Sequence, residues 1–86
     1  MVARTPTTIK SSEGFVHRWE VFEAEVSLND TITFPDFLDS TVLLQGMIHR
    51  KDTGATITST LALNVLTVTG AATNAKVFGY LYGVKA

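Results

Sequence analysis

The sequence predicts a small all-β protein, an antiparallel β-sandwich or partly closed barrel with an extended N-terminal arm. β-branched threonine recurs in TPTT, TIT, TGATITST and TVT, and such residues favour pleated, half-buried surfaces. Several stretches alternate apolar and polar residues with period two, which is typical of strands. Short turns separate these stretches without strand–helix alternation, so mainly antiparallel pairing is expected.

Length and composition indicate one domain with little capacity to stabilise itself. A chain of 86 residues forms a single domain, and domains of this size bury only about 60% of the surface that the unfolded chain exposes. There is no cysteine, which excludes disulfides and thiolate metal sites. Partner subunits are therefore the common means of stabilisation that the composition leaves open.

Charge and hydropathy exclude several classes of partner. The net charge is −1 and charged residues make up 17% of the chain, which is neither a basic nucleic-acid surface nor an acidic tail. No apolar run approaches the roughly 18–20 residues of a membrane helix. The start of the chain lacks the apolar segment of a secretory signal. We expect no membrane partner, no nucleic acid and no export.

Residues 1–14, MVARTPTTIKSSEG, are predicted to be an extended arm with low affinity for the rest of the chain, residues 15–86, which forms the single β domain. Three roles remain open for this arm: a disordered tail, a segment that becomes ordered on a neighbouring subunit, or a contact with nucleic acid. If it binds a neighbouring subunit, Arg4 and Ile9 are its candidate interface residues.

The stretch FVHRWEVFEAEVSL, residues 15–28, is predicted to be a strand, with a helix over 16–26 as the alternative. Phe22 and Val26 share one face by period-two alternation. Trp19 and Val21 would lie on the opposite face, and a bulge near Val21 and Phe22 would bring the two halves together.

The next segments predict a turn, a short strand and a loop whose apolar residues fill one end of the core. The asparagine–aspartate pair at 29–30 marks a turn, and TITF follows as a strand that places Ile32 and Phe34 on one face. PDFLDS is expected to be a loop or one helical turn, with Phe37 and Leu38 filling an end of the core.

Two stretches, 41–51 and 56–66, predict one long hairpin with an apolar inner face and a threonine-rich outer face. RKDTGA between them supplies the turn, where Gly54 can adopt a positive φ. Gly46 indicates a bulge or a close approach of another backbone. Leu63 is assigned to the inner face.

The last predicted strand, KVFGYLYGV, has one bulky and one nearly bare face. Phe78, Tyr80 and Tyr82 share the bulky face, and glycines on the other face suggest that another backbone or sheet lies close to them. We expect the aromatic face to be covered by the core or by a second subunit. Trp19 is interpreted in the same way.

No pattern of residues predicts catalysis, so no enzyme activity, cofactor or metal site is expected. Nucleophile-elbow and phosphate-loop motifs are missing from the sequence. His17 and His49 could meet only if their strands paired, and a metal would still need a third ligand.

The carboxylates and the aromatic residues each allow a second interpretation. Glu23 and Glu25 are expected in solvent, or paired across strands with Arg18 or Arg50. Stacking of sugars or single-stranded nucleic acid is the alternative to packing for the aromatic side chains. The residues concerned are Trp19, Tyr80 and Tyr82.

The stretch ATITSTLALNVLTVTGAATNAKVFGYLYGVKA resembles the C-terminal half of small virion proteins of tailed bacteriophages, including head-associated and decoration proteins. The shared features are a threonine-rich hairpin, NVLTVTGAAT and an apolar final strand ending in GVKA. The resemblance covers residues 41–86. The first forty residues contain no motif that resembles these proteins.

This resemblance implies a non-enzymatic structural subunit, a capsid decoration or cement protein assembled into the virion in the host cytoplasm. It implies binding to major capsid or other virion proteins and a homo-oligomer, for which a trimer is favoured. Another phage part, such as a tail, connector or spike component, and a small glycan- or single-stranded nucleic-acid-binding module are the alternatives. The candidate interface residues are Arg4, Ile9, Trp19, Phe37, Phe78, Tyr80 and Tyr82.

Overall fold

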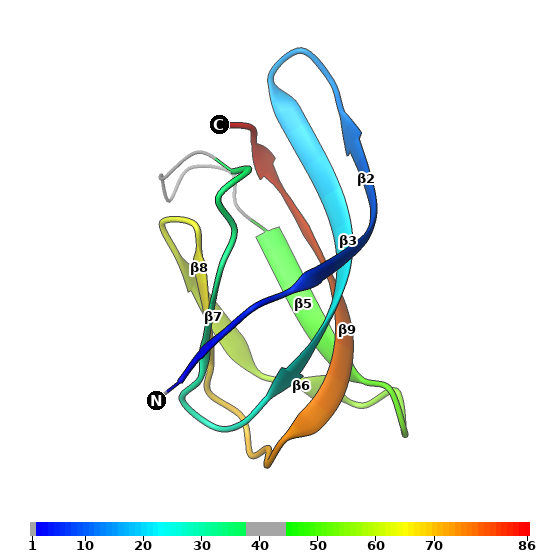
Figure 1. The fold of residues 1–86 in the computed structure, drawn as a ribbon, viewed down its shortest axis with the longest axis vertical. Coiled ribbons are helices and arrows are strands. Elements are labelled where there is room, and N and C mark those ends of the chain that lie inside the picture. Colours follow the sequence, from blue (N-terminus) through cyan, green and yellow to red (C-terminus); the bar gives the residue numbers. More distant parts are fainter. Residues whose placement is uncertain (1, 38–44) are drawn as a thin grey trace.

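The computed structural model describes residues 2–37 and 45–86, which form nine strands and no helix. Two sheets make a sandwich that is not closed into a barrel, so the predicted all-β class is confirmed (Figure 1). The strands are β1 (Ala3–Arg4), β2 (Thr7–Glu13), β3 (His17–Val26), β4 (Thr31–Thr33), β5 (Gln45–Arg50), β6 (Thr56–Ile57), β7 (Ser59–Ala62), β8 (Val65–Val68) and β9 (Ala75–Val84).

The larger sheet has five strands in the order β2-β3-β9-β5-β6 and is antiparallel throughout. β3 and β9 are each ten residues long and pair along their whole length. β5 pairs with the other side of β9, which makes β9 the central strand. The prediction of a strand at the end of the chain is confirmed.

The smaller sheet has the order β1-β4-β8-β7, with β1 parallel to β4 and the other pairs antiparallel. Its β7 shows that the predicted long hairpin is wrong. Only Thr56–Ile57 of the return segment pairs with β5, and the chain then crosses to the other sheet. The carbonyl of Thr58 accepts hydrogen bonds from the amides of Thr69 (2.9 Å) and Gly70 (3.0 Å), which fix the crossing point.

The return segment also reverses direction earlier than predicted. Leu63 has a φ of 57° in the turn between β7 and β8, and its side chain is 48% exposed rather than on an inner face. β8 then runs back along β7 instead of continuing it. Alternation persists on both sides of the crossing because Ile57 and Leu61 both reach the core, so periodicity alone could not reveal the change of sheet.

The segment predicted as an arm is extended but is not separate from the domain. β1 pairs with β4, and β2 pairs with β3 as the outer strand of the larger sheet. The expectation of low affinity for the rest of the chain is therefore wrong. The threonines and serines of this segment form an edge strand whose side chains are all exposed, and such a strand gains its stability mainly from backbone pairing.

β3 runs without the predicted bulge, and a register shift lies instead in the neighbouring β2. Phe22 and Val26 are fully buried, as their spacing predicts. Glu20 shares their face and is only 3% exposed. Trp19 and Val21 consequently point away from the core. The bulge prediction failed because it assumed that the apolar side chains of this half must face inwards.

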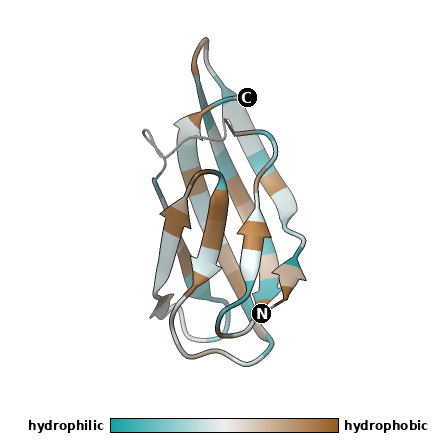
Figure 2. Cartoon of the chain, turned by 90° about the vertical axis from the view of Figure 1, so that its left-hand side faces the viewer, coloured by the Kyte–Doolittle hydropathy of each residue, from teal (hydrophilic) through white to brown (hydrophobic). Residues whose placement is uncertain are grey.

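The core lies between the sheets, and Figure 2 shows brown apolar segments alternating with paler ones along the strands. Phe22 packs edge-to-face on Phe34, with ring centroids 4.9 Å apart. The buried apolar side chains are Phe22, Val26, Ile32, Phe34, Phe37, Ile48, Ile57, Leu66, Val68, Ala75, Val77 and Leu81.

Several predicted turns are confirmed. Asn29 (φ 70°) and Gly54 (φ 78°) adopt the left-handed conformation in their turns. The amide of Phe37 donates to the carbonyl of Phe34 (3.1 Å), and Phe37 is 1% exposed, so it fills an end of the core. The predicted contribution of Leu38, and the first residues of the predicted strand 41–51, lie outside the described residues.

Candidate functional site

The outer face of the larger sheet, turned away from the core, carries a group of apolar side chains that we call the aromatic face. Five of them are 37–41% exposed, and the sixth, Val21, is partly buried. The aromatic face consists of Trp19 and Val21 on β3, Met47 on β5, and Phe78, Tyr80 and Tyr82 on β9.

The register of three adjacent strands brings these side chains together. Trp19 lies opposite Tyr82, and Val21 lies opposite Tyr80. Met47 flanks Tyr80 from the other side. Directly opposed residues in antiparallel strands have Cβ atoms about 4.5–5.5 Å apart, so the aromatic face is a continuous surface.

The opposite side of β9 explains why the aromatic side chains are exposed. Val77 and Leu81 are fully buried, and a Cβ on Gly79 would lie 2.9 Å from Cζ of Phe22. Because side chains alternate along a strand, burial of these residues places the intervening aromatic residues outside. The groups closest to Gly79 are the Met47 carbonyl and the side chains of Ile48 and Phe22, which lie on the adjacent strands of the same sheet. The predicted close approach of another backbone is therefore confirmed at Gly79, but it comes from β5 and not from another sheet. The alternative that the core covers the aromatic face is wrong.

Two imidazole rings extend the aromatic face. His17 stacks on Tyr82 with ring centroids 5.3 Å apart and planes 7° apart. His49 lies over Phe78, with centroids 5.5 Å apart and planes 29° apart. The surface is hollowed here into an apolar depression of about 500 Å³, lined by Trp19, Val21, His49, Phe78, Gly79 and Tyr80.

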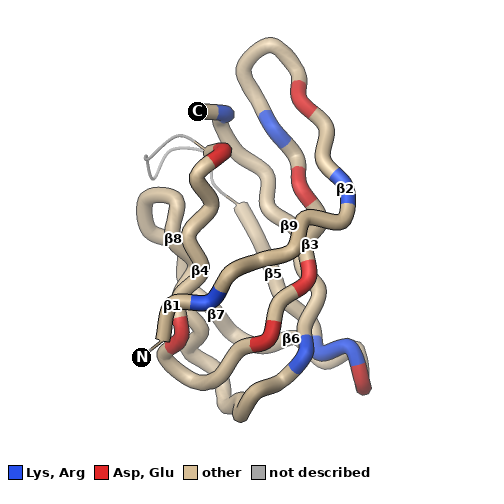
Figure 3. The backbone as a smooth tube through the Cα atoms, viewed as in Figure 1, with Lys and Arg blue, Asp and Glu red and all other residues tan. Residues whose placement is uncertain are grey.

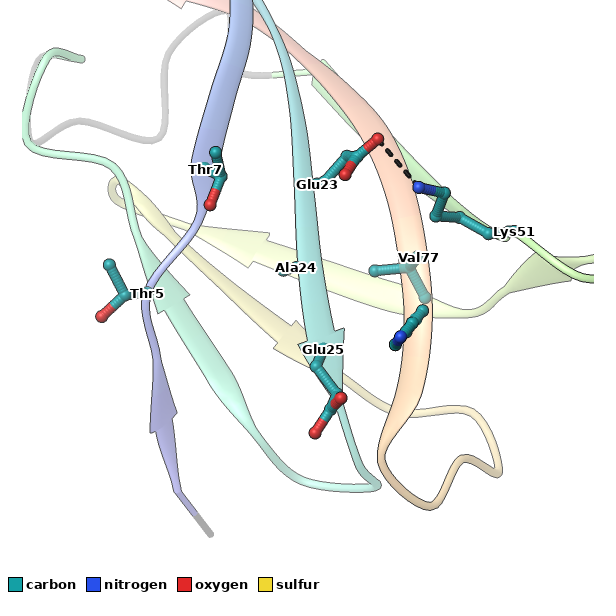
Figure 4. Close-up of a pocket in the computed structure, with 8 residues that line it drawn as sticks. Thr5, Thr7, Glu23, Ala24, Glu25, Lys51 and Val77 are labelled. Atoms are coloured by element: carbon teal, nitrogen blue, oxygen red, sulfur yellow. Dashed lines mark hydrogen bonds and ion pairs between the residues drawn. The ribbon is translucent and has the colours of Figure 1, made fainter.

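Charged residues lie beyond Phe78 and limit the apolar surface. Oε1 of Glu23 and Nζ of Lys51 are 3.0 Å apart, and this ion pair spans β9 (Figure 4). A second depression of about 350 Å³ lies beside it, lined by Thr5, Thr7, Glu23, Ala24, Glu25, Lys51, Lys76 and Val77. Both signs of charge occur here, whereas β7 and β8 carry none (Figure 3), so this region is an ion-paired rim.

The turn between β2 and β3 exposes two apolar residues, Phe15 and Val16, which we call the hairpin tip. Phe15 is 96% exposed and Val16 is 46% exposed. The amide of Gly14 donates to the carbonyl of His17 (2.8 Å), and the amide of Lys85 donates to the carbonyl of Val16 (2.9 Å). The backbone of the hairpin tip is therefore held in place although the Phe15 side chain packs against very little.

A cluster of charges on the core side of β3 ties the hairpin to the domain. Arg18 forms ion pairs with Glu13 (2.6 Å) and Asp36 (3.5 Å), and its Nε is 3.9 Å from Oε2 of Glu20. The hydroxyl of Thr8 donates to the buried Glu20 carboxylate. Within the described residues, Nε of Arg18 has no hydrogen-bond partner. The cluster therefore links β2, β3 and the turn after β4.

The predicted interface residue Arg4 is engaged within its own chain. Its Nε donates to Oδ2 of Asp30 (2.6 Å), and a second guanidinium nitrogen donates to Asn74 (2.9 Å). The Asp30 carboxylate also accepts the amides of Ser27 (2.8 Å) and Val2 (3.1 Å). The Arg4 hydrogen bond, aided by these amides, holds the pKa of Asp30 below its usual value against the opposing effect of burial.

The other predicted interface residues divide into two groups. Trp19, Phe78, Tyr80 and Tyr82 come together on the aromatic face, and Ile9 is 55% exposed on the edge strand β2. Phe37 is the exception, because its burial in the core removes it from the surface, and its assignment to an interface is corrected here.

Sequence reasoning missed the outward position of three apolar residues, of which Met47 and Phe15 are exposed and Val21 is partly buried. Met47 could have been found because period two from the buried Ile48 places it outside. Val21 follows from Phe22 by the same argument. Phe15 follows a glycine in a polar stretch, SSEGF, where an isolated phenylalanine in a turn is itself a signal of exposure.

The candidate catalytic and metal-binding residues do not converge. β9 lies between the strands of His17 and His49. Within residues 2–37 and 45–86, no group of three potential ligands could hold a metal ion. Glu23 pairs with Lys51, and Glu25 lies 3.9 Å from Arg4. Their side chains are 43% and 48% exposed, so the predicted exposure to solvent is confirmed and the alternative, pairing with Arg18 or Arg50, is wrong.

Comparisons with protein-family models, with curated proteins and with solved structures gave no match to this chain. No helix with the length and apolar character of a membrane span occurs in the part of the chain that the structure describes.

Proposed function

We propose that this protein is a non-enzymatic structural subunit that binds other protein subunits through its aromatic face. The observation that carries the proposal is the clustering of Trp19, Met47, Phe78, Tyr80 and Tyr82, each more than a third exposed, on one side of the larger sheet. Aromatic residues and methionine are the types enriched at the centres of protein interfaces.

The size of the aromatic face suits this role. A large aromatic side chain buries about 150–250 Å² when fully covered, so five side chains at roughly 40% exposure offer about 400 Å² of apolar area. The largest apolar patch on a typical monomer covers about 300–600 Å² and is often functional. A stable interface buries about 800 Å² on each partner, so the polar residues around the aromatic face would supply the remainder.

The distribution of charge supports a protein partner over a nucleic acid. The Glu23–Lys51 ion pair neutralises one end of the aromatic face, and the chain has a net charge of −1. Nucleic-acid binding needs a surplus of cations along the binding surface. An interface with an apolar centre and a mixed polar rim is typical of protein–protein contacts.

Within this class we favour a capsid decoration or cement subunit of a tailed bacteriophage, working as an oligomer. The features supporting this choice are the resemblance of residues 41–86, the small size of the chain and its exposed interaction surface. Such a subunit would bridge major capsid proteins in the virion by burying its aromatic face. A tail, connector or spike component is the alternative within the particle.

The first experiment tests the aromatic face directly. A variant with Phe78→Ser and Tyr80→Ser is compared with a control carrying Leu28→Ser and Leu63→Asn, whose leucines are 47% and 48% exposed elsewhere. Wild type and control should associate in light scattering, with themselves or with purified capsid protein, and the aromatic variant should not. A folded aromatic variant that associates as strongly as wild type would refute the role of this face.

The second experiment tests the place in the particle. Capsids assembled without this protein should break at a lower temperature than complete capsids and should regain resistance when it is added. If capsids lacking the protein withstand heat and osmotic shock equally well, the decoration role is wrong. Electron microscopy of labelled particles would separate a head position from a tail or connector position.

A glycan-binding module is the second candidate, because the rings of Trp19 and Tyr82 are cross-strand neighbours on an open surface. Planar aromatic rings of this kind can stack on the faces of sugars. Clear binding on a glycan array, lost on Trp19→Ser, would favour this function. A flat response on the array, together with no binding in a salt-dependent single-stranded DNA titration, leaves the structural subunit.

A further inference from the structure

The hairpin tip projects from the molecule as an apolar finger. The β2–β3 hairpin extends beyond the other strands at one end of the longest dimension (Figures 1 and 2), which measures 37 Å. Phe15 at its end is 96% exposed. The hydrogen bonds at Gly14 and Val16 and the Arg18–Glu13 ion pair of 2.6 Å fix its backbone, so little conformational entropy remains to be lost on binding.

The depression on the aromatic face is a receptor of matching chemistry. Its apolar lining comes mainly from Trp19, Phe78 and Tyr80, and its volume is about 500 Å³. An enclosed apolar cavity of about 150 Å³ holds a benzene molecule, so the volume of this open depression is large enough to admit a phenylalanine ring. Aromatic rings also gain from edge-to-face contacts with one another.

We propose that Phe15 of one chain inserts into the depression on the aromatic face of a second copy. This inference rests on the proposed function and names the partner of the aromatic face. The two surfaces are different parts of the same chain, so the contact is heterologous: each copy offers one hairpin tip and one depression. Repetition of such a contact gives a ring if the rotation closes and an open chain if it does not.

Charge does not oppose this contact. Glu13 and Lys85, which flank the hairpin tip, lie 3.9 Å apart as a weak ion pair, and the Glu23–Lys51 pair borders the depression. Both surfaces are thus close to neutral, and each chain carries a net charge of only −1. Copies can approach without strong mutual repulsion.

The area involved predicts how strong the contact is. Covering Phe15 removes about 200 Å² and covering three partly exposed aromatic residues removes about 80 Å² each, using 150–250 Å² for a whole side chain. This total of roughly 450 Å² is below the roughly 1,200 Å² of the smallest standard interfaces. One contact alone should therefore be weak, and closure into a ring, with two contacts for each copy, would stabilise the assembly.

A mixing experiment distinguishes this contact from a symmetric one. Phe15→Ser removes the hairpin tip and keeps the depression, whereas Phe78→Ser with Tyr80→Ser removes the depression and keeps the tip. Each variant alone should sediment as a monomer. Because one contact alone is weak, the dimer is sought at millimolar concentration, where their equimolar mixture should form a one-to-one dimer that grows no further, since only one complementary pair of surfaces remains. Leu28→Ser, a control for the loss of an exposed apolar residue, should assemble like wild type.

Two results would overturn the inference and leave the proposed function standing. If Phe15→Ser assembles like wild type while the Phe78→Ser, Tyr80→Ser variant does not, the aromatic faces pack on each other or on a different protein. If wild type remains monomeric at millimolar concentration, a second copy is not the partner, and binding to capsid protein decides the proposed function separately.

Cross-linking provides a measurement that tolerates weak binding. The chain contains no cysteine, so Val16→Cys and Met47→Cys introduce single thiols beside Phe15 on the hairpin tip and beside the depression, and both leave Phe15 in place. On oxidation in air, the mixture of the two should form a mixed disulfide dimer at least ten times faster than a mixture of Val16→Cys with Leu28→Cys. Equal rates in both mixtures would contradict the contact. Circular dichroism of each variant confirms folding, and Tyr80→Ser alone replaces the double variant if that unfolds.

Discussion

Replacing Gly79 by alanine tests the close packing beneath the aromatic face. A Cβ at this position would lie 2.5 Å from the carbonyl oxygen of Met47, 2.9 Å from Cγ2 of Ile48 and 2.9 Å from Cζ of Phe22. The first of these contacts is with the backbone of a paired strand, so rotation of a side chain cannot relieve it. Phe22 is fully buried and has no space to retreat into. β5 and β9 would therefore have to move apart locally.

The expected loss of stability follows from two opposing effects. Overpacking a filled site costs about 1–3 kcal/mol, and the backbone contact at Gly79 places this substitution near the upper limit. Alanine in a strand is otherwise favoured over glycine by roughly 0.5–1 kcal/mol, since it has less backbone freedom to lose. The net destabilisation should be about 2 kcal/mol, which lowers the midpoint of thermal unfolding of a domain of this size by about 8–16 °C.

Thermal and urea unfolding followed by circular dichroism measure this difference. Gly14→Ala is the matched control, because a Cβ there would meet only the carbonyl oxygen of His17, at 3.9 Å. Its effect should stay within about 0.5 kcal/mol. If Gly79→Ala unfolds at the same temperature and urea concentration as Gly14→Ala, then β5 and Phe22 do not approach β9 as closely as described, and the explanation for the exposed aromatic residues fails.

Two further predictions concern the buried charges. The Arg4 hydrogen bond keeps the pKa of Asp30 low, so Asp30 contributes stability that is complete above its unfolded pKa of about 3.9 and is lost as the pH falls through the lower folded value. The difference in unfolding midpoint between wild type and Asp30→Asn should be constant between about pH 5 and 7 and shrink on further acidification; a difference that grows in acid contradicts this. Arg18→Met leaves the Glu20 carboxylate, 3% exposed, without its cationic neighbour, at a cost of about 1–3 kcal/mol in urea unfolding. Arg18→Met with Glu20→Gln should recover most of that loss, and equal losses in the two variants would show that these side chains do not interact.

Period-two alternation predicted the elements in which one face is wholly apolar and buried. β4, with Ile32 buried and Phe34 just beyond its end, and β9, with Val77 and Leu81 buried, follow the pattern directly. The turn at Gly54 was predictable because the positive φ it adopts suits glycine. In these segments local preference and tertiary packing agree, so the sequence alone is sufficient to predict the strand or turn and its buried residues.

The failures lie where packing overrides the local pattern. The return segment after Gly54 alternates without interruption, yet Thr58 marks a crossing between sheets that depends on hydrogen bonds from Thr69 and Gly70, remote in sequence. The strand β2 contains mostly polar, exposed residues, so its sequence has no hydrophobic pattern that predicts a strand. β2 pairs with the free edge of β3 through backbone hydrogen bonds. Every residue carries these backbone groups, so the pairing leaves no mark in the pattern of side chains.

The candidate site was predictable in its residues but not in its orientation. Tyr80 and Tyr82 were identified from their alternation, and the sequence left open whether the core or a partner covers them. The bare face of β9 decides this point, since Gly79 lies directly against Phe22. A glycine-rich face can be read as exposed or as tightly covered, and only the position of the neighbouring strand distinguishes the two.

The orientation of β3 gives a physical reason to assign the aromatic face to a partner. Near its beginning, Arg18 and Glu20 lie on the core side while Trp19 points outwards. A shift of one residue would exchange these sides, but it would also remove Phe22 from its place 4.9 Å from Phe34. Burial of one such side chain contributes about 1.5–3 kcal/mol, so the core fixes the register. Because the core holds Trp19 outwards, more than a third of its surface is exposed to water. In an isolated chain, a polar residue at this position would avoid that exposure of apolar surface. This exposure of Trp19 supports the proposal that a partner covers the aromatic face.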